Sequence, residues 1–314
     1  MNLFLIIFGL AIVLLFSYFN SGNFDYSFMG RMTLIIMTVY TLTSLFFQRI
    51  KKFDDLIEVN NIFLVIMILL IINNLGENIV EDIYIDQLKS TVGFIIIFIP
   101  LRLCIFNRMS LFELLLLFFC IYLTIVTGSR SSLVGFVVFV LLYAYKLNIK
   151  IFSIMVSAFI LSMTISHSFF SEHFIVSQEG SNSVRMFMLS IPFSYGDGIG
   201  DYLFGMGFLK WKGILINNVG NIFWLTDEFA EGANPHNFIV ELFIRGGGVL
   251  VIFLGYLLFR ILFRNRISPF LIAGLIPVFL GTTTGYERYV LAVLIAYAII
   301  AKRIDALESR LMSL

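Results

Sequence analysis

Arginine and histidine side chains at three places in the chain have the chemistry to bind a phosphate group or to exchange a proton. Arg130 lies in a short turn between two apolar runs, and Arg185 lies in a longer polar stretch. A guanidinium group can hold two phosphate oxygens at once. His236 stands directly before another apolar run, and an imidazole titrates near neutral pH. Each residue also has a simpler interpretation, because interfacial arginines reach lipid headgroups and lone histidines are more often structural.

Three further side chains extend this set. Asn237 follows His236, so it could orient the imidazole or cap the helix that begins there. Trp211 lies in the same polar stretch as Arg185 and could stack on a sugar ring, although tryptophan is also common at membrane interfaces. Arg288 lies in a turn near the C-terminus and could add another cation to a binding site, although a solvated turn is the simpler interpretation.

A charged pair lies inside the apolar run that follows His236. Glu241 and Arg245 are four residues apart, with the acid before the base. This order favours an ion pair within a helix, and pairing lowers the free energy of placing both charges in a bilayer. We expect the pair to have a structural role.

Motifs for other chemistries are missing from the sequence. The glycines between residues 196 and 207 are not followed by the Gly-Lys-Ser/Thr of a nucleotide-binding loop, so they indicate turns and close backbone packing. The histidines and cysteines lack the spacing of zinc ligands. Asp197 and Asp201 could bind a cation weakly, but their spacing does not require one. We therefore expect no metal and no cofactor.

The composition is that of a membrane protein. Hydrophobic residues make up 60% of the 314 positions and charged residues 13%, which does not fit a water-soluble core. The net charge of +1 argues against binding to nucleic acid. A membrane-spanning helix needs roughly 20 apolar residues, and runs of about this length occur at residues 2–19, 32–48, 56–73, 91–106, 111–127, 131–146, 151–170, 237–259, 268–284 and 286–301.

The distribution of charge predicts the orientation of these runs, because lysine and arginine are retained in short cytoplasmic loops. With a cytoplasmic N-terminus, each short outside loop holds a single cation, whereas the inside loops and tail hold Arg49, Lys51, Lys52, Arg102, Arg108, Lys146, Lys150, Arg260, Arg264, Arg266, Lys302, Arg303 and Arg310. The sequence thus predicts one all-α, polytopic membrane domain over residues 1–314. It has about ten spanning helices, both termini are cytoplasmic, and a large extracytoplasmic loop at residues 171–235 separates helices 7 and 8.

Read in order, the outside motifs resemble the O-antigen ligase and polymerase family of bacterial membrane glycosyltransferases, across roughly residues 110–260. The matching motifs are Ser129-Arg130-Ser131, Val184-Arg185-Met186, Phe204-Gly205-Met206-Gly207-Phe208, His236-Asn237, and Glu241 with the run Gly246-Gly247-Gly248. Arg245 departs from the family pattern, which usually has an apolar residue there, and the chain is short for the group.

The resemblance implies transfer of a glycan from undecaprenyl diphosphate to a sugar hydroxyl, outside the cytoplasmic (inner) membrane of a bacterium. In that reaction Arg130 and Arg185 would clamp the leaving diphosphate, and His236 would take the proton of the attacking hydroxyl. The cations would make a metal dispensable, so we expect a metal-independent, inverting transfer. Asn237, Arg288 and Trp211 are the candidate substrate-binding residues.

Several alternatives stay open. Polymerisation of lipid-linked repeat units into O-antigen or capsule comes first, because polymerases vary most in size and sequence. A ligase or a protein O-oligosaccharyltransferase would use the same donor. A lipid-linked glycan flippase or polysaccharide exporter would also be polytopic, and a third possibility is a non-catalytic assembly subunit. The expected partners are the lipid-linked donor and acceptor, the bilayer, a chain-length regulator and a flippase.

Overall fold

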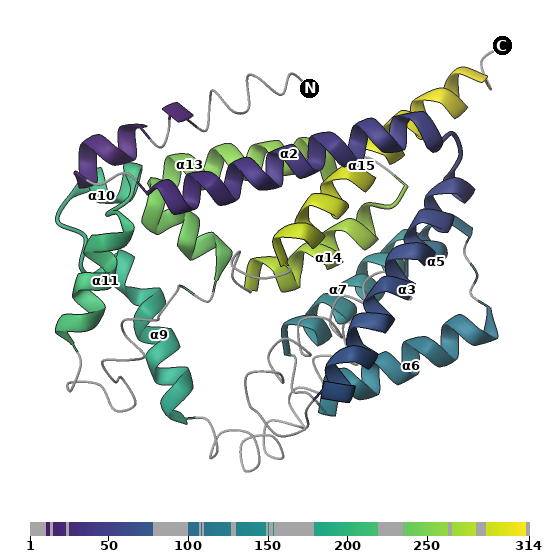
Figure 1. The fold of residues 1–314 in the computed structure, drawn as a ribbon, viewed down its shortest axis with the longest axis horizontal. Helices are drawn as coiled ribbons and strands as arrows, with labels where there is room; N and C mark the ends of the chain where they lie inside the picture. The colour runs from purple at the N-terminus through teal and green to yellow at the C-terminus, as the bar shows by residue number, and fades with distance from the viewer. Residues whose placement is uncertain are drawn as a thin grey trace. The chain divides into compact units, whose positions relative to one another are not determined.

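The structure is a computed structural model, and every element of secondary structure in the part of the chain that it describes is a helix (Figure 1). It describes residues 11–12, 15–22, 25–77, 100–106, 108, 110–126, 130–148, 150, 153, 179–218, 235, 237–262, 266–280 and 287–311. The helices are α2 (Tyr26–Arg49), α3 (Phe53–Glu77), α5 (Leu101–Phe106), α6 (Leu111–Val126), α7 (Arg130–Leu147), α9 (Glu179–Ser194), α10 (Ile199–Phe204), α11 (Phe208–Asn217), α13 (Phe238–Leu262), α14 (Ser268–Leu280) and α15 (Glu287–Leu311). The predicted all-α class is confirmed for these residues.

The chain divides into two compact units, each built from two separate stretches of sequence. The first comprises Met1–Thr33 and Ser153–Leu257, and the second comprises Leu34–Phe152 and Leu258–Leu314. The expected single domain stays a prediction.

Among the described residues, two helices are long and apolar enough to cross a membrane, namely α2 and α13. Shorter apolar helical stretches occur at Ser132–Lys146 and Ser268–Phe279. Length and composition do not by themselves establish insertion, because a core helix of a soluble protein can have both. The predicted count of about ten spans is not confirmed, and the runs at 2–19, 91–106 and 151–170 lie largely outside the described residues.

The second unit is held together by close helix packing. In α7, a Cβ on Gly135 would lie 2.9 Å from the carbonyl oxygen of Ala273 in α14, so the missing side chain lets the two helices approach. Tyr297 of α15 is fully buried, and its ring lies 6.1 to 6.5 Å from those of Phe46, Phe63 and Phe270. These contacts bring α2, α3, α14 and α15 to one aromatic core.

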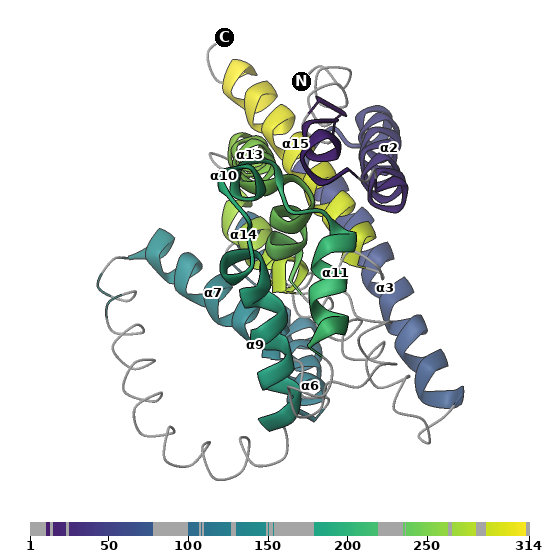
Figure 2. The ribbon, with the colours of Figure 1, turned by 90° about the vertical axis from the view of Figure 1, so that its left-hand side faces the viewer.

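The first unit contains the predicted extracytoplasmic loop, and its described part is helical. Residues 179–218 form α9, α10 and α11, and α9 lies beside α11 in both views (Figures 1 and 2). Helix α9 begins at Glu179 and contains Arg185. A buried core holds these helices against α13, and its members are Met188, Ile191, Met206, Trp211, Leu215 and Ile244. Residues 179–218 of the polar stretch are therefore a packed structure rather than an irregular loop.

Helix α13 is broken at Gly247, although the sequence predicted a continuous helix over residues 237–259. Gly247 has φ +62° and ψ −165°, a conformation that is essentially restricted to glycine. A Cβ at this position would lie 2.3 Å from the carbonyl of Leu203 and 2.5 Å from the nitrogen of Phe204. The backbone at the end of α10 thus occupies the space where a side chain would stand.

The break frees carbonyl groups of α13, and neighbouring segments supply the missing donors. The N–H of Gly207 donates to the Ile244 oxygen over 2.9 Å, and the Ser17 hydroxyl donates to the Arg245 oxygen. Buried backbone groups need such partners, and most strongly in an apolar environment. The N-terminal segment and the turn before α11 therefore complete the broken helix.

Replacing Gly247 by alanine tests the break. An alanine with a positive φ in this region lowers the stability by about 1 to 3 kcal/mol, even without a steric clash. Here the added Cβ would also clash with backbone, which cannot rotate away as a side chain can. We expect Gly247→Ala to lower the midpoint of thermal unfolding by several degrees or to prevent folding. Gly255→Ala is the matched control, because Gly255 lies in the same helix with open space around its Cβ position. Equal midpoints for the two variants would contradict the broken helix.

Candidate functional site

A buried network of two acids and two bases lies at the start of α13. Glu241 is only 2% exposed, and its Oε1 lies 3.0 Å from Nη2 of Arg31 and 3.2 Å from Nε of Arg245. The guanidinium of Arg245 also pairs with Asp25. The predicted ion pair between Glu241 and Arg245 is therefore confirmed, and it belongs to a larger network whose formal charges cancel.

Asp25 joins this network to the start of α2. Its Oδ1 accepts the N–H of Phe28 over 2.9 Å, so it caps the first turn of α2, while Oδ2 faces Arg245. Asp25 and Arg31 come from the N-terminal part of the chain, and Glu241 and Arg245 come from α13. The network thus fixes two distant stretches of sequence to each other.

Two aromatic rings enclose the Arg245 guanidinium. Its central carbon lies 5.0 Å from the centroid of Phe28 and 4.3 Å from that of Phe208. A cation over an aromatic face is stabilised by the ring quadrupole, and more so when water is excluded. Arg245 is 4% exposed, so its charge is fully committed to internal contacts and it holds α2, α11 and α13 together.

The glycine turn before α11 packs directly on α13. Gly205 and Gly207 have φ values of +89° and +80°. A Cβ on Gly205 would lie 2.6 Å from the Ile244 oxygen, and one on Gly207 would lie 2.6 Å from Cβ of Ser21. The interpretation of these glycines as turns with close backbone packing is confirmed.

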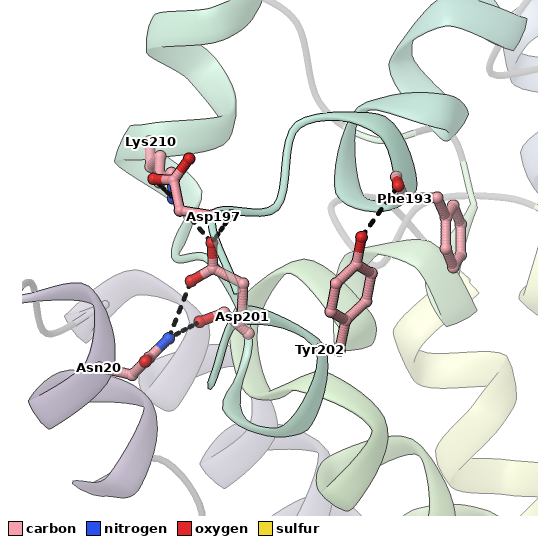
Figure 3. A network of polar contacts seen from close by, with 7 residues as sticks. Asn20, Phe193, Asp197, Asp201, Tyr202 and Lys210 are labelled. Carbon is pink, nitrogen blue, oxygen red and sulfur yellow. Dashed lines mark hydrogen bonds and ion pairs between the residues drawn. The ribbon is translucent and has the colours of Figure 1, made fainter. Parts of the chain in front are cut away.

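A second polar cluster fastens α10 to the N-terminal segment (Figure 3). Lys210 lies 2.5 Å from a carboxylate oxygen of Asp197 and 2.7 Å from one of Asp201. The side-chain amide of Asn20 donates to Asp201 over 3.0 Å and to the Gly205 oxygen over 2.8 Å. The two carboxylates suggested as a weak cation site are thus bound by the ammonium of Lys210.

The pKa values in this cluster follow from its hydrogen bonds. Partial burial by itself raises the pKa of Asp201, but bonds from Lys210, the Asp197 N–H and Asn20 outweigh it and hold that pKa below the ordinary value of 3.8. Burial by itself lowers the pKa of Lys210, but its bonds to Asp197 and Asp201 raise that pKa above 10.5. Both groups are therefore charged across the neutral range.

The structure places two of the predicted substrate-binding residues in structural roles. Oδ1 of Asn237 accepts the N–H groups of Ile239 and Val240 over 2.9 and 3.1 Å, so Asn237 caps α13, as one of its two interpretations required. Trp211 is 0% exposed, and its indole nitrogen donates to the Met188 oxygen over 3.2 Å. The expectation that Trp211 stacks on a sugar does not fit this position, because the core of the first unit covers its ring.

The other candidate residues are located only by their backbone or their neighbours. His236 lies outside the described residues, between Pro235 and the cap of α13. The backbone of Arg185 lies in α9 of the first unit, while those of Arg130 and Arg288 lie in α7 and α15 of the second. The side chains of these arginines are outside the described part of the structure, so their assigned roles stay predictions.

Comparisons with known proteins place the chain in no family: no family model, no curated protein and no solved structure matches it. Among the described residues, no three histidine, cysteine or acidic side chains lie together in a way that could hold a metal ion.

Removing the central arginine tests the buried network. We expect Arg245→Met to destabilise the protein by about 3 to 5 kcal/mol, because the buried Glu241 and the partly buried Asp25 lose a shared counter-charge. Arg266→Met is the control, since Arg266 and its partner Glu308 are 45% and 43% exposed and 3.8 Å apart, and such a surface pair contributes about 1 kcal/mol or less. Denaturant unfolding in detergent micelles measures both. A similar small loss for both variants would contradict a buried network.

The Lys210 cluster gives a prediction about pH. A carboxyl group whose pKa is lower in the folded state stabilises the fold at pH values above its unfolded-state pKa, and this stabilisation is lost as pH falls through its folded-state pKa. A lysine whose pKa is higher in the folded state stabilises the fold until pH rises through its folded-state pKa. The difference in thermal midpoint between wild type and Lys210→Met should therefore be constant from about pH 5 to 9 and shrink below about pH 4. Lys212→Met, in the same helix, is the control. A difference that grows towards acid would contradict the assignment.

Proposed function

We propose that the chain is a polytopic integral membrane protein. Besides the two membrane-length helices among the described residues, this is supported by apolar side chains that stay exposed. In α6, Leu111, Phe112, Leu115, Phe118 and Phe119 are each more than half exposed. Water would oppose exposure of so continuous an apolar surface, whereas acyl chains would not. The bacterial cytoplasmic membrane, the ten spans and cytoplasmic termini belong to the same proposal.

We further propose that the protein is a glycosyltransferase that polymerises undecaprenyl-diphosphate-linked repeat units into O-antigen or capsule. One observation carries this proposal: the Phe204–Phe208 motif packs against the half-helix of α13 that begins after Asn237 and contains Glu241. The Phe204–Phe208 turn packs on Ile244 and Gly246, and Phe208 covers Arg245. Asn237 caps the same half-helix, and His236 precedes Asn237 in the sequence.

The proposed reaction is a displacement at the anomeric carbon of the donor. The acceptor hydroxyl attacks that carbon as the bond to the diphosphate oxygen breaks, and His236 takes the hydroxyl proton as a general base. Undecaprenyl diphosphate leaves with the bonding electron pair. Arg130 and Arg185 would hold its charge through paired N–H···O bonds, and attack opposite the leaving group inverts the anomeric configuration. In this scheme the arginines neutralise the diphosphate, so no metal is required.

Within this proposal, the ion pairs of Arg245 and Glu241 give both residues a role in positioning other groups. Because Arg245 is enclosed by two rings and two carboxylates, it is not available to bind a phosphate. It instead fixes the first half of α13, which begins directly after His236. We assign Glu241 and Arg245 as positioning residues and reserve contact with the donor for the other arginines.

Ligation to another acceptor uses the same donor and the same residues, so it remains the nearest alternative. A lipid-linked glycan flippase or exporter is the second candidate, because broken helices with buried charges also occur at transport sites. In this chain the carbonyls freed by the break are bound by Ser17 and Gly207. That arrangement favours a packing role for the break over a passage for substrate.

Purified protein in lipid vesicles tests the function directly. The donor is the lipid-linked repeat unit extracted from a deletion strain of the host bacterium, EDTA is present, and a gel resolves the products. We expect a ladder from wild type and none from His236→Ala, Arg130→Ala or Arg185→Ala. His173→Ala is the matched control for the histidine and should keep the ladder. Arg185→Lys should lose most activity, because an ammonium cannot bind two phosphate oxygens as a fork.

The outcomes separate the candidates. A ladder that persists in His236→Ala would contradict the role of this residue as general base. A wild-type ladder that EDTA abolishes would contradict the metal-independent mechanism. A folded protein without a ladder would exclude polymerase activity on this donor and favour ligation, with transport as the next candidate.

A further inference from the structure

An exposed apolar patch surrounds α10 in the first unit. Ile199, at 78% exposed, and Leu203, at 42%, are aliphatic residues that the unit leaves uncovered. The full set, here named the α10 patch, is Phe193, Ile199, Tyr202 and Leu203. Apolar side chains that gather on one surface usually mark contact with a partner or a membrane.

The α10 patch is the apolar face of an amphipathic segment. Ile199, Tyr202 and Leu203 are spaced three and four residues apart and share one side of α10. Residues between and after them turn the other way, since Asp201 accepts a bond from Asn20 and the Phe204 ring stacks at 5.4 Å on that of Phe16. The N-terminal segment thus covers one face of α10 and leaves the apolar face outward.

The contacts of α10 hold it next to the segment that directly precedes α2. Asn20 donates to Asp201 and to the Gly205 oxygen, and the candidate membrane helix α2 begins only six residues later, at Tyr26. Tyr26 is 79% exposed and Phe19 72%. Aromatic side chains at the end of a spanning helix are typical of the headgroup region. The patch is therefore held where α2 would enter the bilayer.

The polar groups of the same segment fit this placement. Lys210, Asp197 and Asp201 form their cluster beside the patch, and the Tyr202 hydroxyl donates to the Phe193 oxygen over 3.0 Å (Figure 3). Tyrosine with a bonded hydroxyl and an exposed ring suits a boundary between water and acyl chains. A segment with one apolar and one charged face lies in the plane of that boundary.

We infer that the α10 patch is embedded in the outer interface of the phospholipid bilayer, so that α10 lies on the membrane rather than standing away from it. The inference rests on the membrane part of the proposed function. It deepens that function, because it holds the Phe204–Phe208 turn and the start of α13 at the depth of a lipid-linked diphosphate.

Nitroxide labels at single cysteines test the inference without any substrate. Ile199→Cys carries the test label, Asn217→Cys is an exposed control at the end of α11, and Phe118→Cys reports on α6, where Phe118 is 61% exposed. Cys104 and Cys120 are replaced by alanine, and thermal unfolding checks each fold. The protein is reconstituted in vesicles of phosphatidylethanolamine and phosphatidylglycerol. Collision rates with oxygen, which enters lipid, and with a nickel chelate, which stays in water, are measured.

We expect the ratio of oxygen to nickel collisions to be several-fold higher at Ile199 and Phe118 than at Asn217. A collision ratio typical of lipid at Phe118, together with a ratio typical of water at Ile199, would overturn the inference and leave the membrane proposal intact. Collision ratios typical of water at both positions would overturn both the inference and the membrane proposal. Leu203→Cys serves as a second label within the patch, so that a folding defect of Ile199→Cys does not decide the result.

Discussion

The break of α13 at Gly247 is the constraint on which the first unit depends. A continuous helix would satisfy its own carbonyls and would leave no room for the backbone at Leu203. Once the helix opens, the Ile244 and Arg245 oxygens require donors, and the only way to supply them within a buried region is to bring other segments there. Gly207 and Ser17 come from stretches far apart in sequence, so one local departure from helical geometry organises three segments.

The same region buries Glu241 and Arg245 and partly buries Asp25 and Arg31, in a chain with few charged residues. Each charge is costly to desolvate alone, and pairing recovers that cost only when geometry and hydrogen bonds are good. Here Glu241 contacts two guanidinium groups, and Arg245 contacts two carboxylates and two rings. An apolar cluster of the same size would hold the helices together with less selectivity for one partner. We interpret the network as the element that selects the N-terminal segment as the partner of α13.

How much the sequence could predict depends on how far apart in the sequence two interacting residues lie. The Glu241–Arg245 pair and the Asn237 cap lie within one helical turn of their contacts, so spacing alone was sufficient. The roles of Asp25, Arg31 and Lys210 were not foreseen, because their partners lie elsewhere in the chain. The break at Gly247 was not foreseen, because an apolar run of spanning length favoured a continuous helix. Trp211 was assigned to a surface because its neighbours are polar, whereas tertiary packing placed it in the core.

The contact between Asp25 and Arg245 joins α2 to α13, so a double-mutant cycle on this pair tests the account most directly. Unfolding free energies would be measured for wild type, Asp25→Asn, Arg245→Met and the double variant, with Arg266 and Glu308 as the surface pair for comparison. We predict a coupling energy above about 1 kcal/mol for the buried pair and about 0.5 kcal/mol or less for the surface pair. A coupling energy near zero for Asp25 and Arg245 would show that the N-terminal segment is not held on the broken helix, and would contradict the assembly described here.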